Sequence, residues 1–347
     1  ILPGIMTPGH VSSLARDIIA ELQRPFELAG NEVFVGASIG ISLFPQDGED
    51  FVTLTRHADA AMYQAKSAGR GQYRFFTASL NERLQRRANL ETGLRTALEK
   101  DEFCLVYQPK VDVASRQVKG FEALLRWRSP QLGPVSPAEF IPLAEDTGMI
   151  IDIGAWVLET ACREARGWQE AGHAGLHVAV NLSARQFQYK SLVAEVEGAL
   201  QRERLPAAAL ELELTETLLM SDVATSLKVM EALRELGLSI AVDDFGTGYS
   251  SLAYLKRLPI QTLKIDRSFV NEMTETSDDA SIVQAILSLA RRLQLGVVAE
   301  GVETPRQHEL LLAGGCEVAQ GFYYARPIPA AEVLGYLQRA AAGKAVG

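Results

Sequence analysis

Cysteine and histidine are scarce in this sequence, and the few present form no metal-binding pattern. The chain has no CxxC pair and no cysteine–histidine cluster, so a structural zinc site is not expected. The three cysteines stand far apart and are expected to be small buried residues in a reducing compartment; they are Cys104, Cys162 and Cys316. The five histidines are expected on the surface or on helices, without ligand roles; they are His10, His57, His173, His177 and His308.

Long apolar runs and an excess of positive charge are also absent. The longest apolar stretches, such as residues 148–158, are short and contain Asp152, so we expect no membrane span. The formal net charge of −9 argues against a nucleic-acid surface, which would normally be basic. It does not exclude an anionic ligand, because bound divalent cations can reverse the local field.

The N-terminal residues lack the charged segment and apolar run of a signal peptide. With the scattered cysteines, this predicts a cytoplasmic location. The sequence also begins without methionine, so we expect a chain cut from a longer protein, in which any membrane tether would lie upstream of Ile1.

The length of 347 residues suits one large domain and a smaller unit, and residues 1–76 are expected to form the smaller one. Its expected elements are a helix at 11–22, a strand at 33–44 that Gly36 and Gly40 interrupt, a helix at 51–67 and a strand at 73–76. Residues 77–100 then predict an amphipathic helix. This helix either connects two units or packs on its own domain.

From Phe103 onward, strand-like runs alternate with helical patterns, as in parallel βα units. The remaining length is roughly what a (β/α)8 barrel needs. Only a short turn, residues 114–117, separates the first two strands, so one strand is expected to be antiparallel. The expected strands are 104–107, 118–125, 177–181, 210–214, 239–242, 262–265, 296–299 and 318–322.

Polar residues stand at the ends of most of these strands. Because the carboxyl ends of parallel barrel strands meet at one face, the side chains are expected to converge there. Crowded carboxylates repel each other, and a divalent cation would offset that repulsion. Each acid alone could instead cap the next helix, but capping does not account for so many strand ends in succession. The residues are Glu122, Asn181, Glu213, Asp243, Asp244, Lys264, Asp266, Glu300 and Gln320.

These side chains offer carboxylate and amide oxygens, which suit Mg²⁺ or Mn²⁺ better than Zn²⁺ or copper. The neighbours Asp243 and Asp244 would face opposite ways in a regular strand, so both reach the site only where Gly246 and Gly248 release the backbone. Two neighbouring carboxylates with further acids nearby suit two metal ions about 3.5–4 Å apart.

Lys264 and Asp266 lie two residues apart and share one face of their strand. A lysine among acids keeps its charge and can orient water or balance phosphate charge, but it can also be a simple salt-bridge residue. Arg126, four residues after Glu122, either reaches a substrate phosphate or forms an ion pair at the rim.

In these motifs the chain resembles the EAL-domain cyclic di-GMP phosphodiesterases, from about Leu94 to the C-terminus. The motifs stand in the family's order as Glu122-Ala123-Leu124, Asn181-Leu182-Ser183, Glu213-Leu214-Thr215-Glu216, Asp243-Asp244-Phe245-Gly246-Thr247-Gly248, Lys264-Ile265-Asp266, Glu300-Gly301-Val302-Glu303 and Gln320-Gly321-Phe322. The resemblance implies a modified TIM (β/α)8 barrel that hydrolyses cyclic di-GMP to linear pGpG with two Mg²⁺ or Mn²⁺ ions. It also implies a homodimer formed through the barrel.

The resemblance further implies a role for each motif residue. The implied metal ligands are Glu122, Asn181, Glu213, Asp243, Asp244 and Glu300. The implied catalytic residues are Lys264, Glu300, Glu303 and Glu216. Lys264 would position the attacking water, and Glu216 would hold the loop from Asp244 to Ser251, which couples metal binding to dimerisation in active relatives. The implied substrate contacts are Gln108, Arg126, Asp266 and Gln320.

The first segment resembles the C-terminal half of a GGDEF (diguanylate cyclase) domain. The matching motifs are Ala37-Ser38-Ile39-Gly40-Ile41, residues 58–66 and Gly69-Arg70-Gly71. The hairpin that names that family is absent, so no cyclase activity is expected from this chain. The expected domains are residues 1–76 (GGDEF part), 77–93 (helical linker) and 94–347 (EAL domain).

One position departs from the EAL pattern, since Gln261 stands where the family often has Asp. It lies outside the ligand set, so the departure bears on regulation more than on catalysis. Two alternatives stay open: a receptor that binds cyclic di-GMP without hydrolysing it, and a hydrolase of another phosphodiester.

Overall fold

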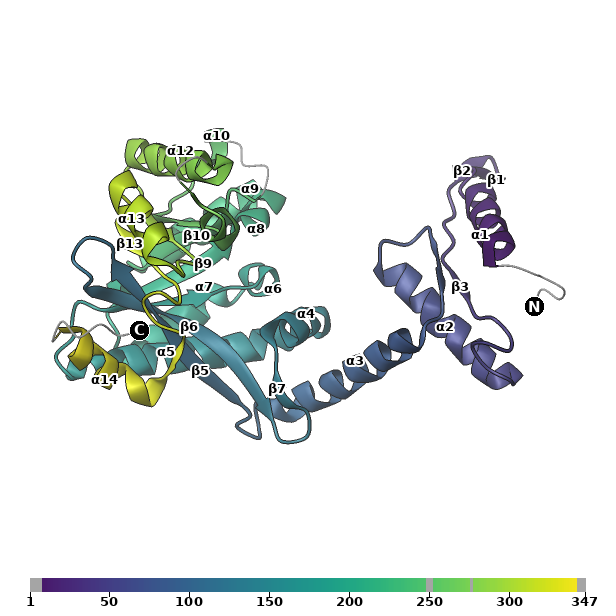
Figure 1. Ribbon diagram of the computed structural model, residues 1–347, viewed down its shortest axis with the longest axis horizontal. Helices are drawn as coiled ribbons and strands as arrows, with labels where there is room; N and C mark the ends of the chain where they lie inside the picture. Colours follow the sequence, from purple (N-terminus) through teal and green to yellow (C-terminus); the bar gives the residue numbers. More distant parts are fainter. Residues whose placement is uncertain (1–7, 248–251, 275–276, 342–347) are drawn as a thin grey trace. The chain divides into compact units, whose positions relative to one another are not determined.

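The computed structural model describes residues 8–247, 252–274 and 277–341, which belong to two compact units (Figure 1). The first unit comprises residues 1–92 and the second residues 93–347. In the described ranges, no helix combines the length and the apolar character that crossing a membrane requires.

The N-terminal unit is a small α/β arrangement. Its elements are α1 (Pro8–Leu22), the antiparallel pair β1 (Phe26–Leu28) and β2 (Asn31–Val33), the parallel pair β3 (Ile39–Ile41) and β4 (Tyr73–Phe75), and α2 (Phe51–Ser67). Helix α2 packs directly on β3, because a Cβ on Gly40 would lie 1.9 Å from the Ala58 carbonyl oxygen. Both predicted helices are present. The predicted strand at 33–44 was too long, since Phe34 and Val35 are exposed and bury no face.

Helix α3 (Ala78–Ala97) occupies the expected linker region and continues into the second unit. Its last turn belongs to the core of that unit. Leu94 and Ala97 are buried, and a Cβ on Gly93 would lie 3.2 Å from the Trp127 ring. The C-terminal end of the helix therefore packs on the barrel.

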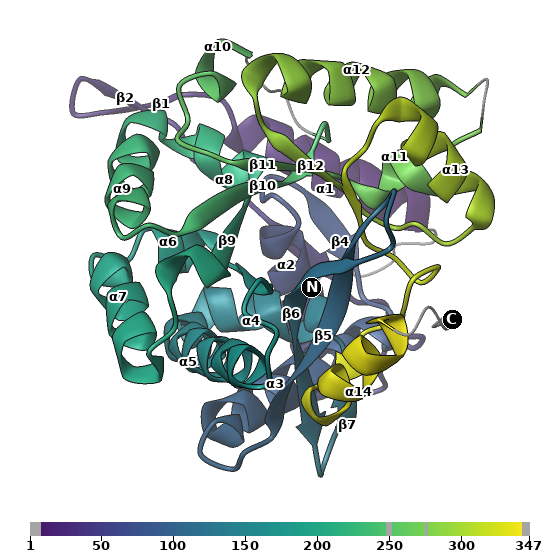
Figure 2. The same cartoon turned by 90° about the vertical axis from the view of Figure 1, so that its left-hand side faces the viewer.

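The second unit is a closed eight-stranded barrel (Figure 2). Strand β5 closes it by pairing antiparallel with both β6 and β13, while the other neighbours are parallel. The predicted barrel with one reversed strand is confirmed. In spatial order the strands are β5 (Phe103–Asp112), β13 (Val318–Ala319), β12 (Gly296–Ala299), β11 (Thr262–Ile265), β10 (Ser239–Phe245), β9 (Leu210–Thr215), β8 (His177–Asn181) and β6 (Val118–Ser129).

Helices surround the strands, as Figure 2 shows for α5, α7, α9, α12 and α13. Two short strands, β7 (Gly133–Val135) and β14 (Ile328–Pro329), pair with β6 and β5. The helices are α4 (Pro137–Thr147), α5 (Ile150–Glu170), α6 (Ala184–Phe187), α7 (Leu192–Glu203), the 3₁₀ turn Ala207–Ala209, α8 (Glu216–Ser221), α9 (Val223–Glu235), α10 (Leu252–Leu255), α11 (Arg267–Asn271), α12 (Asp278–Leu293), α13 (Pro305–Gly314) and α14 (Ala330–Ala341).

Alternation along each strand separates an apolar outer face from a polar interior. On β9, Leu212 and Leu214 are fully buried on the outer face, whereas Glu211 and Glu213 point into the barrel toward Lys110 of β5. A barrel interior is ordinarily filled by branched apolar residues. Here inner positions of β5 and β9 instead carry charge, so the barrel interior contains a polar region.

The strand predicted at 318–322 was also too long, because β13 ends at Ala319. The following Gly321 approaches Val302 so closely that a Cβ would lie 2.1 Å from the Val302 carbonyl oxygen. The chain therefore leaves the sheet to pack on the loop after β12.

All three cysteines are free thiols; Cys162 and Cys316 are buried and Cys104 is partly so.

Candidate active site

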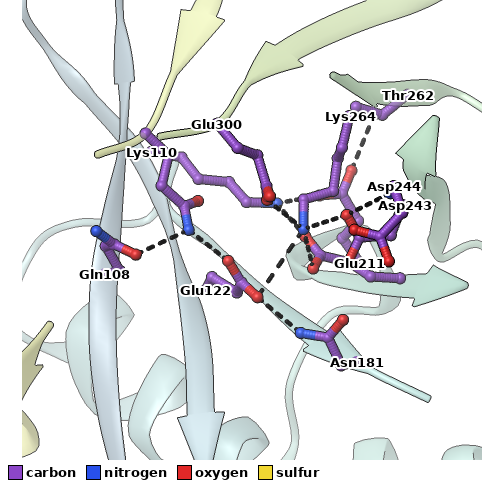
Figure 3. A network of polar contacts seen from close by, with 12 residues as sticks. Gln108, Lys110, Glu122, Asn181, Glu211, Asp243, Asp244, Thr262, Lys264 and Glu300 are labelled. Atoms are coloured by element: carbon purple, nitrogen blue, oxygen red, sulfur yellow. Dashed lines mark hydrogen bonds and ion pairs between the residues drawn. The ribbon is translucent and has the colours of Figure 1, made fainter. Parts of the chain in front are cut away.

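The Lys264 side chain, from β11, lies at the centre of a group of carboxylates inside the barrel (Figure 3). Its Nζ is 2.6 Å from Glu213 Oε2, 2.7 Å from Glu300 Oε1 and 3.0 Å from Asp243 Oδ1. Glu122 Oε1 is farther, at 3.9 Å. Four of the expected acids, Glu122, Glu213, Asp243 and Glu300, therefore lie together around one ammonium group.

Glu122 is held on its other side by amide groups. Asn181 Nδ2 donates to Glu122 Oε1 at 2.7 Å, and Gln320 Nε2 donates to Glu122 Oε2. Gln320 Nε2 also donates to Gln108 Oε1 at 3.1 Å, and Gln108 Nε2 donates to the Ala325 carbonyl at 3.3 Å. Both glutamines expected to contact substrate are therefore buried beside Glu122.

The neighbours Asp243 and Asp244 reach the same region because the backbone turns between them. Asp244 has a φ of +53°, and the pairing of β10 with β11 shifts register between Val242 and Phe245. The Asp244 amide donates to Asp243 Oδ1 at 3.0 Å. Burial and the nearby Asp243 and Asp266 raise the pKa of Asp244 to about 6. The break expected at Gly246 thus begins at Asp244 itself.

Glu216 lies at the start of α8 and holds the beginning of the loop that follows β10. Its buried side chain accepts a hydrogen bond from the Gly246 amide at 3.1 Å through Oε2. Within the described residues its Oε1 has no hydrogen-bond partner. Residues 248–251 of the expected loop lie outside the described part of the chain.

Three further predicted residues lie at the edge of the group or outside it. Asp266 caps α11 by accepting from the Ser268 amide at 3.0 Å. Half-buried Arg126 donates to the Leu125 carbonyl at 2.9 Å. Glu303 is exposed before α13. The structure therefore does not bring the Glu303 side chain into the carboxylate group.

Sequence reasoning missed a buried layer formed by Lys110, Glu211 and Thr262. They lie two positions from Gln108, Glu213 and Lys264 on the same strands, so the two-residue period could have found them.

The expectation for the histidines was wrong at His177, which is half-buried at the start of β8. Burial and the nearby Lys110 lower the pKa of His177.

The group carries more negative than positive charge. Its two lysines, Lys110 and Lys264, form ion pairs with five carboxylates, which leaves three negative charges in excess when all five are ionised. Burial and the neighbouring Asp243, Glu122 and Glu213 raise the pKa of Glu300 to about 8, although Lys264 opposes this. The five are Glu122, Glu211, Glu213, Asp243 and Glu300.

The donor set and the charge excess fit a divalent metal of the Mg²⁺ or Mn²⁺ type, which takes oxygen ligands. In the part of the chain that the structure describes, no three Asp, Glu, His or Cys side chains are arranged as a formed metal site. The carboxylate oxygens gather instead on the Lys264 ammonium. A bound cation would therefore compete with Lys264 for the same oxygens.

Two known protein families match this chain. The model of the EAL domain family matches residues 91–327, which is more than half of the chain. The chain belongs to the EAL domain family. The model described as "Diguanylate cyclase, GGDEF domain" matches residues 1–72, so the resemblance of both segments is confirmed.

The EAL domain and its N-terminal segment are similar to several curated bacterial proteins. The bifunctional diguanylate cyclase/cyclic di-GMP phosphodiesterase MucR of Pseudomonas aeruginosa is 49% identical over 94% of this chain and 48% of its own length. The cyclic di-GMP phosphodiesterase PdeR of Escherichia coli is 39% identical over 95% of this chain and 50% of its own length. The chain thus spans about half the length of these relatives.

Solved structures also resemble the EAL domain. The structure titled "PaMucR Phosphodiesterase, c-di-GMP complex" is 52% identical, covers 71% of this chain and 99% of that chain, and has a TM-score of 0.69. The EAL domain of Mycobacterium smegmatis DcpA is 36% identical, covers 68% of this chain and 96% of that chain, and has a TM-score of 0.57.

Proposed function

We propose that this EAL domain hydrolyses cyclic di-GMP to linear pGpG with the help of two divalent metal ions. The observation that carries the proposal is the cluster of carboxylates around Lys264, whose excess negative charge calls for cations. The substrate is proposed from relatives such as MucR and PdeR, named as cyclic di-GMP phosphodiesterases, and from the structure titled as a c-di-GMP complex. Water would add across one P–O3′ bond, with its hydroxyl going to phosphorus and its proton to the leaving oxygen.

The residues that would hold the metal ions are those whose oxygens already converge inside the barrel. When bound, the ions would supply the positive charge that activates water and balances the attacked phosphate. Asn181 already orients Glu122 through its amide nitrogen, which leaves its oxygen for a ligand role. The proposed ligands are Glu122, Asn181, Glu213, Asp243, Asp244 and Glu300.

Lys264 is proposed to orient the attacking water and to stabilise phosphate charge. Although burial alone would lower it, the surrounding carboxylates raise the pKa of Lys264 well above its usual value. An ammonium that stays protonated cannot accept a proton, so it acts as a charge and a donor rather than as a general base. The alternative, a lysine that only forms salt bridges, predicts that Lys264→Met keeps its turnover when Mn²⁺ is bound.

The remaining proposed roles are contact with the substrate and support of the loop after β10. Gln108, Arg126, Asp266 and Gln320 are proposed to contact the substrate, and in Gln320 the buried Oε1 has no hydrogen-bond partner among the described residues. Glu216 is proposed to hold the loop after β10 through Gly246. The catalytic role of exposed Glu303 and the homodimer through the barrel remain predictions.

The direct test is to incubate the purified chain with cyclic di-GMP and excess Mg²⁺ or Mn²⁺ and to separate the products by chromatography. We expect pGpG to accumulate, and none to form in EDTA. Cyclic mono-GMP and cyclic di-AMP serve as control substrates and are expected to react much more slowly. Tight binding of cyclic di-GMP without any pGpG would identify a receptor and reject the proposed enzyme.

Removing the metal should make stability depend on pH. The pKa of Glu300 rises from its ordinary 4.5 to about 8 in the folded chain, so between these values the folded state holds a proton that the unfolded state has lost. In EDTA, Tm is therefore expected to fall as pH rises from about 5 to about 8. Excess Mg²⁺ should flatten this fall, because the cation takes the place of the proton.

Thermal unfolding followed by circular dichroism across this pH range measures the effect. Glu300→Gln is the matched control, since it keeps the shape of the side chain but cannot ionise, and its Tm in EDTA should vary less with pH. Identical pH dependence with and without Mg²⁺ would contradict a cation at this site.

A further inference from the structure

Beneath the carboxylate group lies a second buried lysine that the proposed roles do not use. Lys110, on β5, is fully buried, and its Nζ is 2.6 Å from Glu211 Oε1 and 2.7 Å from Glu213 Oε1. Glu211 Oε2 accepts a hydrogen bond from the Thr262 hydroxyl at 3.0 Å. Lys110, Glu211 and Thr262, here called the lower layer, come from three different strands, β5, β9 and β11.

The lower layer holds Glu213 from the side opposite Lys264. Lys110 contacts Glu213 Oε1 and Lys264 contacts Glu213 Oε2, so both oxygens of one carboxylate are fixed by ammonium groups from different strands. Rotating the carboxylate would break both contacts. Each oxygen has a second lone pair, so the fixed group can still accept a further ligand.

Neither stability nor charge explains the lower layer. Fully buried lysines are rare, and replacing a buried ion pair by apolar residues is often neutral or stabilising. Lys110 alone would neutralise part of the site and weaken its attraction for cations. Glu211, bonded to Lys110, cancels that charge, so the pair adds no net charge to the site. What the pair adds is a fixed contact to Glu213.

We propose that Lys110 is a positioning residue that fixes the carboxylate of Glu213 for metal binding, and that Glu211 and Thr262 keep Lys110 in place. The inference rests on the proposed function, because Glu213 is one of its proposed ligands. Partners that orient a metal ligand typically change metal affinity by about 10- to 100-fold when they are removed. The effect should therefore appear in metal binding, even without substrate.

The test is the double variant Lys110→Met/Glu211→Gln, which removes the contact while leaving the net charge of the interior unchanged. Mn²⁺ binding to the EDTA-treated and dialysed full chain is measured by electron paramagnetic resonance, without substrate. The Kd for Mn²⁺ is expected to rise about tenfold. The Mn²⁺ concentration that gives half-maximal turnover should rise equally. KM for cyclic di-GMP at saturating Mn²⁺ should stay within about twofold, because the Lys110 ammonium bonds to Glu211 and Glu213, and neither is a proposed substrate contact.

The control is Lys119→Met, on the same pair of strands, whose half-exposed ammonium is 3.5 Å from Asp112. It is expected to bind Mn²⁺ as the unchanged chain does. The single variant Lys110→Met would leave the Glu211 carboxylate buried without its ammonium partner. Thr262→Val, which replaces the hydroxyl that donates to Glu211 by a methyl group, therefore gives the second measurement. Its Kd should rise by a smaller factor than that of the double variant.

A double variant with the Kd of the unchanged chain would overturn the positioning role. So would a double variant that does not fold, because the pair would then serve stability. Failure of the proposed function has a different signature, since the unchanged chain itself would then bind no Mn²⁺ or release no pGpG.

Discussion

Glu122→Ala is expected to lower the rate of cyclic di-GMP hydrolysis by more than about a hundredfold. Removing a residue that merely orients a metal ligand typically costs about 10- to 100-fold, and a direct ligand should cost more. Glu122 also joins the two sides of the site, since it accepts hydrogen bonds from Asn181 and Gln320 and lies 3.9 Å from the Lys264 ammonium. The rate of product formation at saturating Mg²⁺ or Mn²⁺ measures the loss of activity. Mn²⁺ binding to the metal-free variant then shows whether weaker metal binding causes that loss.

Two companion variants separate charge from shape. Glu122→Gln keeps the size of the side chain but loses the carboxylate charge, so its turnover should fall nearly as far as that of Glu122→Ala. Glu309→Ala removes an exposed carboxylate of α13, paired only with Arg306 at the surface, and should leave turnover unchanged. Activity retained in Glu122→Ala would refute its assignment as a metal ligand.

Much of the barrel could be predicted from local pattern alone. The strands at 177–181, 262–265 and 296–299 were predicted with the observed bounds, because short apolar runs between helical patterns are typical of buried parallel strands. The antiparallel pairing of β5 with β6 could be predicted because the turn between them, residues 114–117, is too short for a parallel connection. The strand at 318–322 was predicted too long, because the close approach of Gly321 to Val302 depends on a contact that local sequence does not contain.

Asp243, Asp244, Asp266 and Glu300 were found because they stand at or directly after strand ends, which meet at one face of a barrel. Glu122, in contrast, lies inside β6, which is longer than predicted. Glu211 was missed because it stands inside a strand, where charge usually indicates a solvent-facing position. Lys110 was missed because the strand predicted at 104–107 was too short, whereas β5 continues to Asp112. The side of β5 and β9 that carries these two residues is an interior surface only because the barrel is closed. Likewise, the hydrogen bonds of Gln320 with Gln108 and with Glu122 join residues 212 and 198 positions apart, and the local sequence pattern does not predict such contacts.

Lys264→Met is expected to separate stability from catalysis. In EDTA the variant leaves the carboxylates of Glu213, Asp243 and Glu300 without their shared ammonium partner. Breaking a buried ion pair by removing one partner costs about 3–5 kcal/mol in the free energy of unfolding. Urea unfolding in EDTA should show a loss of this size, while Lys119→Met, which removes a half-exposed lysine, should show almost none.

Measurements with Mn²⁺ distinguish a Lys264 that acts in hydrolysis from one that only forms salt bridges. Because the ammonium and a bound cation compete for the same oxygens, Lys264→Met should bind Mn²⁺ more tightly than the unchanged chain and regain most of its lost stability when Mn²⁺ is present. Turnover should nevertheless stay more than about a hundredfold below normal, because the variant lacks the ammonium that orients water and balances phosphate charge, and the other ammonium of the group, Lys110, is bonded to Glu211 and Glu213. If Mn²⁺ restored turnover together with stability, Lys264 would be a salt-bridge residue only, and the carboxylates with their metal ions would suffice for hydrolysis.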